Sequence, residues 1–95
     1  MRIRFKIFGF ARLRQAIGED EINIEFDGSM VKDLVWHLTE VYGDEVAKAI
    51  LQKDGHLKHG VRLLRNGHQW IDRDDLETNI MDGDVLVLSL LVAGG

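Results

Sequence analysis

The sequence has 95 residues, of which 45% are hydrophobic and 29% charged, and this balance predicts one soluble globular domain. Its formal net charge of -4 argues against a general nucleic-acid binder, which needs a basic surface. The absence of cysteine excludes disulfides, thiolate nucleophiles and cysteine-ligated metals. The N-terminus lacks the apolar stretch of a signal peptide, and the apolar run near the C-terminus is too short to span a bilayer, so we expect a cytoplasmic protein.

The first part of the chain predicts two strands joined by a helical connection. Apolar and charged residues alternate over residues 2–8, which predicts a half-buried strand with a basic outer face. Residues 10–17 carry apolar side chains at helical spacing and are followed by Gly18, a residue suited to end a short helix or turn. Alternation returns over residues 21–26 and predicts the second strand of a hairpin with a long connection.

The middle of the chain predicts the main helix. Residues 31–42 place apolar side chains at intervals of three and four residues, which is the stripe of a helix that packs on a core. We expect the Ser29 hydroxyl to cap the first turn of this helix and Gly43 to end it. Residues 44–53 predict a second, shorter helix, and Trp36, which lies beside the stripe, is expected to contribute to packing.

The remaining residues predict three more strands. Residues 61–65 and 68–71 flank Asn66-Gly67, the strongest hairpin signal of the chain, because a type I′ turn needs positive φ at both central residues. Residues 85–92 predict the last strand, which is apolar on both faces as a central strand is. The simplest topology places it parallel to the first strand. We therefore predict an α+β fold, a β-grasp (ubiquitin-like) mixed sheet with one main helix across one face and a short extra helix.

The chain ends in Gly94-Gly95 directly after an apolar strand. Glycine has no Cβ, so such a tail is thin and conformationally free, and it can carry a terminal carboxylate into a narrow active site. We therefore expect a flexible Gly-Gly tail on a single domain that spans residues 1–95. The alternative is an ordinary frayed terminus, since chain ends are often loose.

Short motifs follow one another along nearly the whole chain: Phe10-Ala11-Arg12-Leu13-Arg14 with Gly18, Ser29, Arg65-Asn66-Gly67, Leu76, Asp82-Gly83-Asp84-Val85 and Val92-Ala93-Gly94-Gly95. In this order they resemble the ubiquitin-like sulfur-carrier family. The most similar branches are the small subunit of molybdopterin synthase (MoaD-like) and the small archaeal modifier proteins. The thiazole-synthesis carriers (ThiS-like) share the ending but are usually much shorter.

The resemblance implies a carrier cosubstrate rather than an enzyme, and a role as the small subunit of a synthase complex. A ubiquitin-activating-type adenylyltransferase would use ATP to convert the Gly95 carboxylate to an acyl-adenylate, and sulfur would then replace AMP to give a thiocarboxylate. Ala93 and Gly94 would give the tail access to that active site. The resemblance implies no permanently bound cofactor, because the ATP is used by the activating enzyme.

Two acceptors stay open. In the molybdopterin branch, the thiocarboxylate sulfur is delivered to a cyclic pterin precursor on the large synthase subunit, in molybdenum or tungsten cofactor synthesis. In the modifier branch, the activated Gly95 carbonyl acylates a lysine of a target protein. The segment before the tail reads Ser89-Leu90-Leu91, where the molybdopterin branch usually has a bulky aromatic residue and two prolines. A third hypothesis is a β-grasp binding module whose Gly-Gly has no chemistry.

An apolar surface for partner proteins is expected near the tail. In a β-grasp the helix covers one side of the sheet, so the last strand exposes one of its two sets of residues on the other side, unless the short helix or the loop at 54–60 covers them. The even set is Leu86, Leu88 and Leu90, and the odd set is Val85, Val87, Ser89 and Leu91. The predicted partner-binding residues are Phe8, Phe10, Trp70, Leu88, Leu90, Leu91 and Val92.

The other polar clusters of the sequence predict no catalytic or metal-binding site. His56 and His59 lie in a polar loop with no third ligand evident, so no metal site is predicted. The basic residues of the first strand and the acidic residues of 72–79 are interpreted as solvated surface that could also orient a charged partner. We expect a free monomer that assembles with a larger partner.

Overall fold

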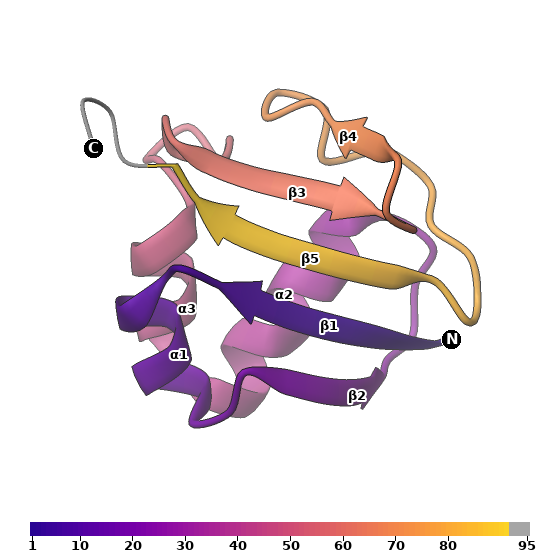
Figure 1. Ribbon diagram of the computed structural model, residues 1–95, viewed down its shortest axis with the longest axis horizontal. Coiled ribbons are helices and arrows are strands. Elements are labelled where there is room, and N and C mark those ends of the chain that lie inside the picture. The colour runs from indigo at the N-terminus through magenta and orange to yellow at the C-terminus, as the bar shows by residue number, and fades with distance from the viewer. Residues whose placement is uncertain (92–95) are drawn as a thin grey trace.

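The computed structural model describes residues 1–91 of the chain. Five strands form one mixed sheet in the order β2-β1-β5-β3-β4. The strands are β1 Arg2–Phe8, β2 Glu21–Glu25, β3 Val61–Arg65, β4 Gln69–Ile71 and β5 Val85–Leu90, and the helices are α1 Ala11–Ile17, α2 Val31–Tyr42 and α3 Asp44–Ile50. β5 lies at the centre of the sheet, parallel to β1 and antiparallel to β3 (Figure 1). The predicted β-grasp fold is confirmed.

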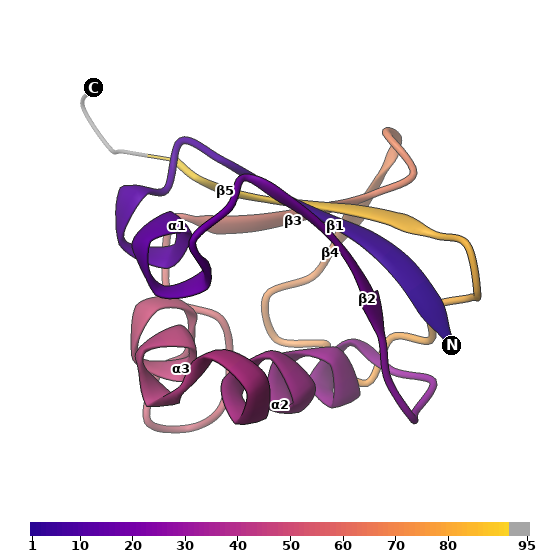
Figure 2. The same cartoon turned by 90° about the horizontal axis from the view of Figure 1, so that it is seen from below.

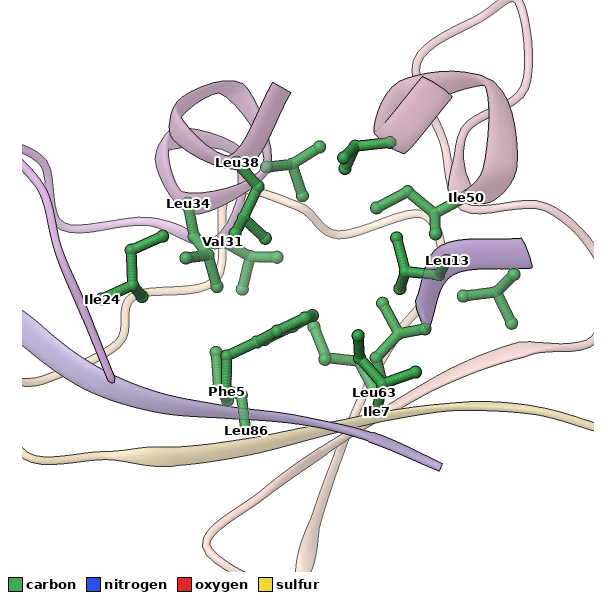
Figure 3. Packing of buried hydrophobic residues seen from close by; sticks show 14 of the residues in the cluster. Phe5, Ile7, Leu13, Ile24, Val31, Leu34, Leu38, Ile50, Leu63 and Leu86 are labelled. Atoms are coloured by element: carbon green, nitrogen blue, oxygen red, sulfur yellow. The ribbon is translucent and has the colours of Figure 1, made fainter. Parts of the chain in front are cut away.

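The helices all lie on one face of the sheet and leave the other face open (Figure 2). The core fills the space between these two layers (Figure 3). Phe5 from β1, Leu86 from β5, and Leu34 and Leu38 from α2 are each at most 1% exposed. Burying a side chain of this size stabilises the fold by about 1.5–3 kcal/mol. Within residues 1–91, no helix combines the length and apolarity needed to cross a bilayer.

The predicted turn at Asn66-Gly67 is confirmed. Asn66 has a φ of 52° and Gly67 a φ of 77°, so both central residues lie in the left-handed region. The His68 amide donates a hydrogen bond to the Arg65 carbonyl at 3.2 Å, which closes the turn. The return strand then begins at Gln69, one residue later than predicted.

The shorter helix ends earlier than the sequence indicated. α3 stops at Ile50, whereas the helical pattern extended to Lys53. Leu51 leaves the helix with an extended backbone (φ -109°, ψ 145°) and forms an isolated bridge with Leu57. This bridge brings Leu57 into the core, where it is 1% exposed, and so ends the helix by tertiary packing.

The cap of α2 differs from the prediction, and the Ser29 hydroxyl does not provide it. The N-cap is Met30, and the Asp33 carboxylate accepts hydrogen bonds from the amides of Ser29 and Met30, both at 3.0 Å. These two hydrogen bonds lower the pKa of Asp33. Gly28 permits this approach, because a Cβ at that position would lie 2.5 Å from the Asp33 Cβ.

Trp36 does not pack in the core, and the expectation that it does is wrong. Trp36 is 67% exposed and borders a surface hollow between α2 and the end of β2, where Glu25 and Phe26 also line it. The helix buries Val31, Leu34, Val35 and Leu38 against the sheet. Trp36 follows Val35 by one position, a rotation of about 100° around the helix axis, and this carries its indole away from the buried stripe.

Candidate partner-binding site

The two faces of β5 differ in exposure. Leu86 and Leu88 lie in the core with 0% and 2% exposure, and Leu90 is partly buried against it. The residues of the opposite face are half-buried or exposed: Val85, Val87, Ser89 and, directly after the strand, Leu91. The odd-numbered set therefore faces outward, which decides the alternative that the sequence pattern left open.

Exposed apolar side chains gather on the open face of the sheet near the end of β5. Phe8 is 73% exposed, Trp70 63% and Leu91 62%. Half-buried neighbours join them, because Trp70 pairs with Leu64 across β4 and β3, and Leu64 pairs with Val87 across β3 and β5. We call Phe8, Leu64, Trp70, Val87 and Leu91 the open-face patch. Contiguous apolar surface of this kind marks interaction sites in monomeric proteins.

A hollow of about 300 Å³ opens within the open-face patch. Arg62, Trp70, Ser89 and Leu91 line it. A neighbouring hollow of about 440 Å³ shares Arg62 and Trp70 and extends to Arg73. The Trp70 indole thus borders two depressions, a shape that can receive protruding side chains of a partner.

Basic side chains flank the open-face patch on β1 and on β3. Those on β1 form ion pairs, whereas the one on β3 forms none with the described residues. Arg4 and Lys6 of β1 lie 3.5 and 3.7 Å from the Glu21 carboxylate of β2. These basic residues therefore form a solvated, partly neutralised strand face. No carboxylate within residues 1–91 forms an ion pair with Arg62 on β3. Its guanidinium offers an anchor for an acidic group of a partner.

Asp84, directly before β5, is buried and holds the β3–β4 hairpin to that strand. Its carboxylate accepts hydrogen bonds from Arg65 Nε at 2.7 Å, from Asn66 Nδ2 at 2.9 Å and from the Met81 amide at 2.7 Å. The Asn66 side-chain oxygen accepts a further bond from the Val85 amide at 2.8 Å. Burial raises the pKa of Asp84, but these hydrogen bonds and the Arg65 charge outweigh it and hold the pKa below its usual range.

The structure brings together some of the predicted partner-binding residues. Phe8, Trp70 and Leu91 are exposed in the open-face patch, and their contact with a partner stays a prediction. Leu90 is only partly exposed. The predicted Val92, the tail residues Ala93 and Gly94, and the reacting Gly95 lie outside the described residues.

Two predicted partner-binding residues are in the core instead. Phe10 is 7% exposed and Leu88 2%, so their assignment to a partner surface is wrong. After β1, Gly9 adopts a φ of 64° and turns the chain, so Phe10 enters the helix layer rather than the open face. Leu88 shares the inward face with Leu86.

Sequence reasoning missed Leu64 and Arg62 as members of this surface. The hairpin offered the signal, because the pairing of Leu64 with Trp70 places both side chains on one face. Arg62 lies two residues before Leu64 in the same strand and shares that face.

The polar clusters outside this surface have local partners. His56 Nδ1 lies 3.2 Å from Asp74 and 3.5 Å from Asp54, and the Asp72 carboxylate accepts a hydrogen bond from the Asp74 amide at 2.9 Å. In the described part of the chain, no three or more His, Asp or Glu side chains are grouped so that they could hold a metal ion. These residues order the loops that carry them.

A last strand at the centre of the sheet, helices on one face and an apolar patch on the other define a ubiquitin-like β-grasp protein. No family model matches the chain. The chain is 30% identical over 84 residues to a protein of Archaeoglobus fulgidus named "Putative sulfur carrier protein", a match that covers 88% of this chain and 94% of that protein. It is also 30% identical over 86 residues to small archaeal modifier protein 3 of Haloferax volcanii, covering 90% and 92% of the two chains.

The chain is also similar to solved structures of proteins of the same kind. SAMP1 from Haloferax volcanii has a TM-score of 0.77 and 25% sequence identity over the whole of both chains. A chain in the complex of subunits 1 and 2 of the molybdopterin-converting factor from Helicobacter pylori has a TM-score of 0.60 and 25% identity, again over both whole chains. The protein belongs to the family of ubiquitin-like sulfur carriers and small archaeal modifier proteins.

Proposed function

We propose that this protein is a sulfur carrier whose C-terminal Gly95 is adenylated and then converted to a thiocarboxylate, which donates sulfur in molybdopterin biosynthesis. Its membership of the carrier and modifier family is the observation that carries the proposal. The open-face patch supports it, since a carrier needs a docking surface close to its reacting end, and Leu91 of that patch lies four positions before Gly95 in the sequence.

The chemistry requires activation, because a free carboxylate is a poor electrophile. A Gly95 carboxylate oxygen would attack the α-phosphate of ATP, form the mixed anhydride of an acyl-adenylate and release pyrophosphate. Hydrosulfide would then attack the Gly95 carbonyl carbon, form a C–S bond and expel AMP. The activating enzyme would supply the catalytic groups and consume the ATP. The carrier itself would supply the carbonyl and the docking surface.

The activating enzyme, an adenylyltransferase of the ubiquitin-activating type, would dock on the open-face patch. Trp70 and Leu91 offer apolar area at the end of β5, and Arg62 offers a positive charge between them. A partner surface with an apolar pocket and an acidic rim would complement these groups. Ala93 and Gly94 present little or no side chain, so a narrow channel would admit them.

The molybdopterin assignment draws support from the structural relative that is one subunit of a two-subunit molybdopterin-converting factor. By analogy, the large subunit of a molybdopterin synthase would bind this carrier on the same open-face patch. One surface cannot hold both partners at once. The carrier would therefore leave the activating enzyme before it delivers sulfur to the pterin precursor.

Protein conjugation is the second candidate, and the relative named small archaeal modifier protein 3 favours it. The adenylate would be the same in this case. A lysine amine of the target would attack the Gly95 carbonyl, form an isopeptide bond and displace the activating group. The two candidates therefore share the activation step and differ only in the nucleophile that follows.

Intact-mass spectrometry tests the shared step. The protein would be incubated with ATP, a cognate adenylyltransferase and sulfide, and the same reaction would be run on a variant that lacks Gly94 and Gly95. We expect the mass to rise by the difference between one sulfur and one oxygen atom in the full-length protein only. If the full-length protein forms neither adenylate nor thiocarboxylate, the proposal is refuted. If the variant that lacks Gly94 and Gly95 replaces the full-length protein in cells without loss of function, the result favours a non-conjugating binding module.

A pull-down from cells separates the two candidates. A stable complex with the large subunit of a molybdopterin synthase would support sulfur transfer to the pterin precursor. A lysine of another protein that carries residues 74–95 of this chain, joined through Gly95, would support conjugation instead. Mass spectrometry after trypsin digestion would find this branched peptide, because Arg73 is the last trypsin site of the chain.

A further inference from the structure

The end of β5 is held by a backbone contact with Gly60, the residue that precedes β3. The Leu91 amide donates a hydrogen bond to the Gly60 carbonyl at 2.7 Å, which extends the pairing of the two strands by one residue beyond β5. In the same contact the Leu91 carbonyl oxygen lies close to the Gly60 Cα. A Cβ at position 60 would lie 2.9 Å from that oxygen.

Position 60 therefore has two requirements that glycine alone meets together. Its φ of +87° lies in the left-handed region, which L side chains rarely adopt. Its close neighbour is a backbone oxygen rather than the end of a flexible side chain, so a side chain at position 60 would have to displace the Leu91 peptide. Gly55, in the same connection, has a similar φ of +88°, but a Cβ at that position would have no neighbouring atom within 4 Å.

We propose that Gly60 is a positioning residue for the reaction at Gly95, because it fixes the point from which the reacting segment starts. The inference rests on the proposed adenylation of Gly95. The Leu91 carbonyl carbon is bonded to the nitrogen of Val92, so a shift of the Leu91 peptide moves the origin of the last four residues. Four residues span at most about 14 Å, which leaves little slack between a docked domain and an enclosed active site. Misplacement of a reacting group by about 1 Å can cost up to about 100-fold in rate.

Steady-state kinetics of adenylation test the proposal. Pyrophosphate release by the cognate adenylyltransferase would be measured against carrier concentration for the wild-type protein, Gly60→Ala and Gly55→Ala. We expect kcat to fall about tenfold in Gly60→Ala while KM changes less than about threefold, because Phe8 and Trp70 still dock. Gly55→Ala carries the same backbone strain without the contact, so its kcat should equal that of the wild type.

A second substitution and a second readout guard against a simple loss of folding. Asparagine tolerates positive φ better than alanine does, so Gly60→Asn isolates the close approach from the backbone strain. Amide hydrogen exchange would report the geometry directly, with protection at Leu91 falling about tenfold in both Gly60 variants and staying unchanged in Gly55→Ala.

The outcomes separate this inference from the proposed function. Wild-type activity with an undiminished kcat in Gly60→Ala and Gly60→Asn would overturn the positioning role and leave the carrier function intact. An equal loss in Gly55→Ala would overturn it too, since strain alone would then explain the result. Failure of the wild-type protein to be adenylated would overturn both.

Discussion

Trp70 should be the strongest single contributor to partner binding, and Trp70→Ala tests the open-face patch. The side chain is 63% exposed, so about 150 Å² of its surface is open to a partner. Burying that area at about 25 cal/mol per Å² would contribute up to about 4 kcal/mol. We expect half of this to be measured, because ordering and imperfect packing oppose binding. The dissociation constant for the adenylyltransferase should therefore rise about 30-fold.

The chain supplies a matched control in Trp36. Trp36 is 67% exposed, but it belongs to α2, and Figure 2 shows this helix on the face of the sheet opposite the open face. Trp36→Ala removes the same group with a similar exposed area, so the dissociation constant should change less than about twofold. Isothermal titration calorimetry of each variant with the adenylyltransferase would give both values.

Two results would refute the reasoning. Equal losses in the two variants would show that an exposed indole matters wherever it lies, and an unchanged affinity in Trp70→Ala would remove the open-face patch from the interface. Urea unfolding provides the check on the fold. Both residues are mostly exposed, so we expect each variant to lose less than about 1 kcal/mol of unfolding free energy.

Further predictions follow from the contacts. Asp84→Ala should lower the free energy of unfolding in urea by about 3 kcal/mol, because it strands the polar groups that its buried carboxylate binds, and a loss below about 1 kcal/mol would contradict this account. The folded pKa of Asp84 lies below its unfolded value, so its stabilisation is present above the unfolded pKa and is lost as pH falls through the folded pKa. The unfolding free energy should therefore decline between about pH 5 and pH 2, less steeply in Asp84→Asn, and identical slopes would refute the assignment. Arg62→Glu should weaken adenylyltransferase binding about tenfold, mainly through slower association that depends on salt, and a salt-independent loss would argue against an acidic partner. Leu88→Ala should cost about 3 kcal/mol of unfolding free energy with partner affinity unchanged, and the reverse pattern would contradict its place in the core.

The sequence predicted the β-grasp because its strongest signals are local. The alternation in β1, the apolar stripe of α2 and the Asn66-Gly67 turn each depend on neighbours a few residues away. The order of these elements then restricts the topology, since a last strand that is apolar on both faces has to lie inside the sheet.

The outward face of β5 could not be predicted in the same way. Leucine and valine alternate in this strand, so both faces read as apolar and the period of two gives no contrast. The register with β1 decides the matter, because Lys6 pairs with Val87 and Ile7 with Leu88. Strand pairing joins residues about 80 positions apart, and no local pattern carries that information.

The wrong predictions for Phe10 and Ser29 also arose from structure that no local sequence pattern shows. Phe10 follows the exposed Phe8 by two positions, which favours the surface in an extended chain, but the turn at Gly9 reverses its direction. Ser29 is a common capping residue, yet the Asp33 carboxylate binds the free amides instead, and Gly28 makes room for it. In both cases the backbone conformation of a glycine decided the outcome.

Some residues of this chain hold β5 in place, and others are exposed where a partner would bind. Arg65, Asn66 and Asp84 lock the start of β5 to the hairpin, and Gly60 holds its end at Leu91. A strand fixed at both ends keeps the position of Leu91 constant, whatever partner is docked on the open face. Substitutions in the Asp84 network should therefore change stability without changing the specificity for partners. Substitutions at Trp70 or Arg62 should do the opposite, because those side chains contribute little to the fold and lie where a partner would bind.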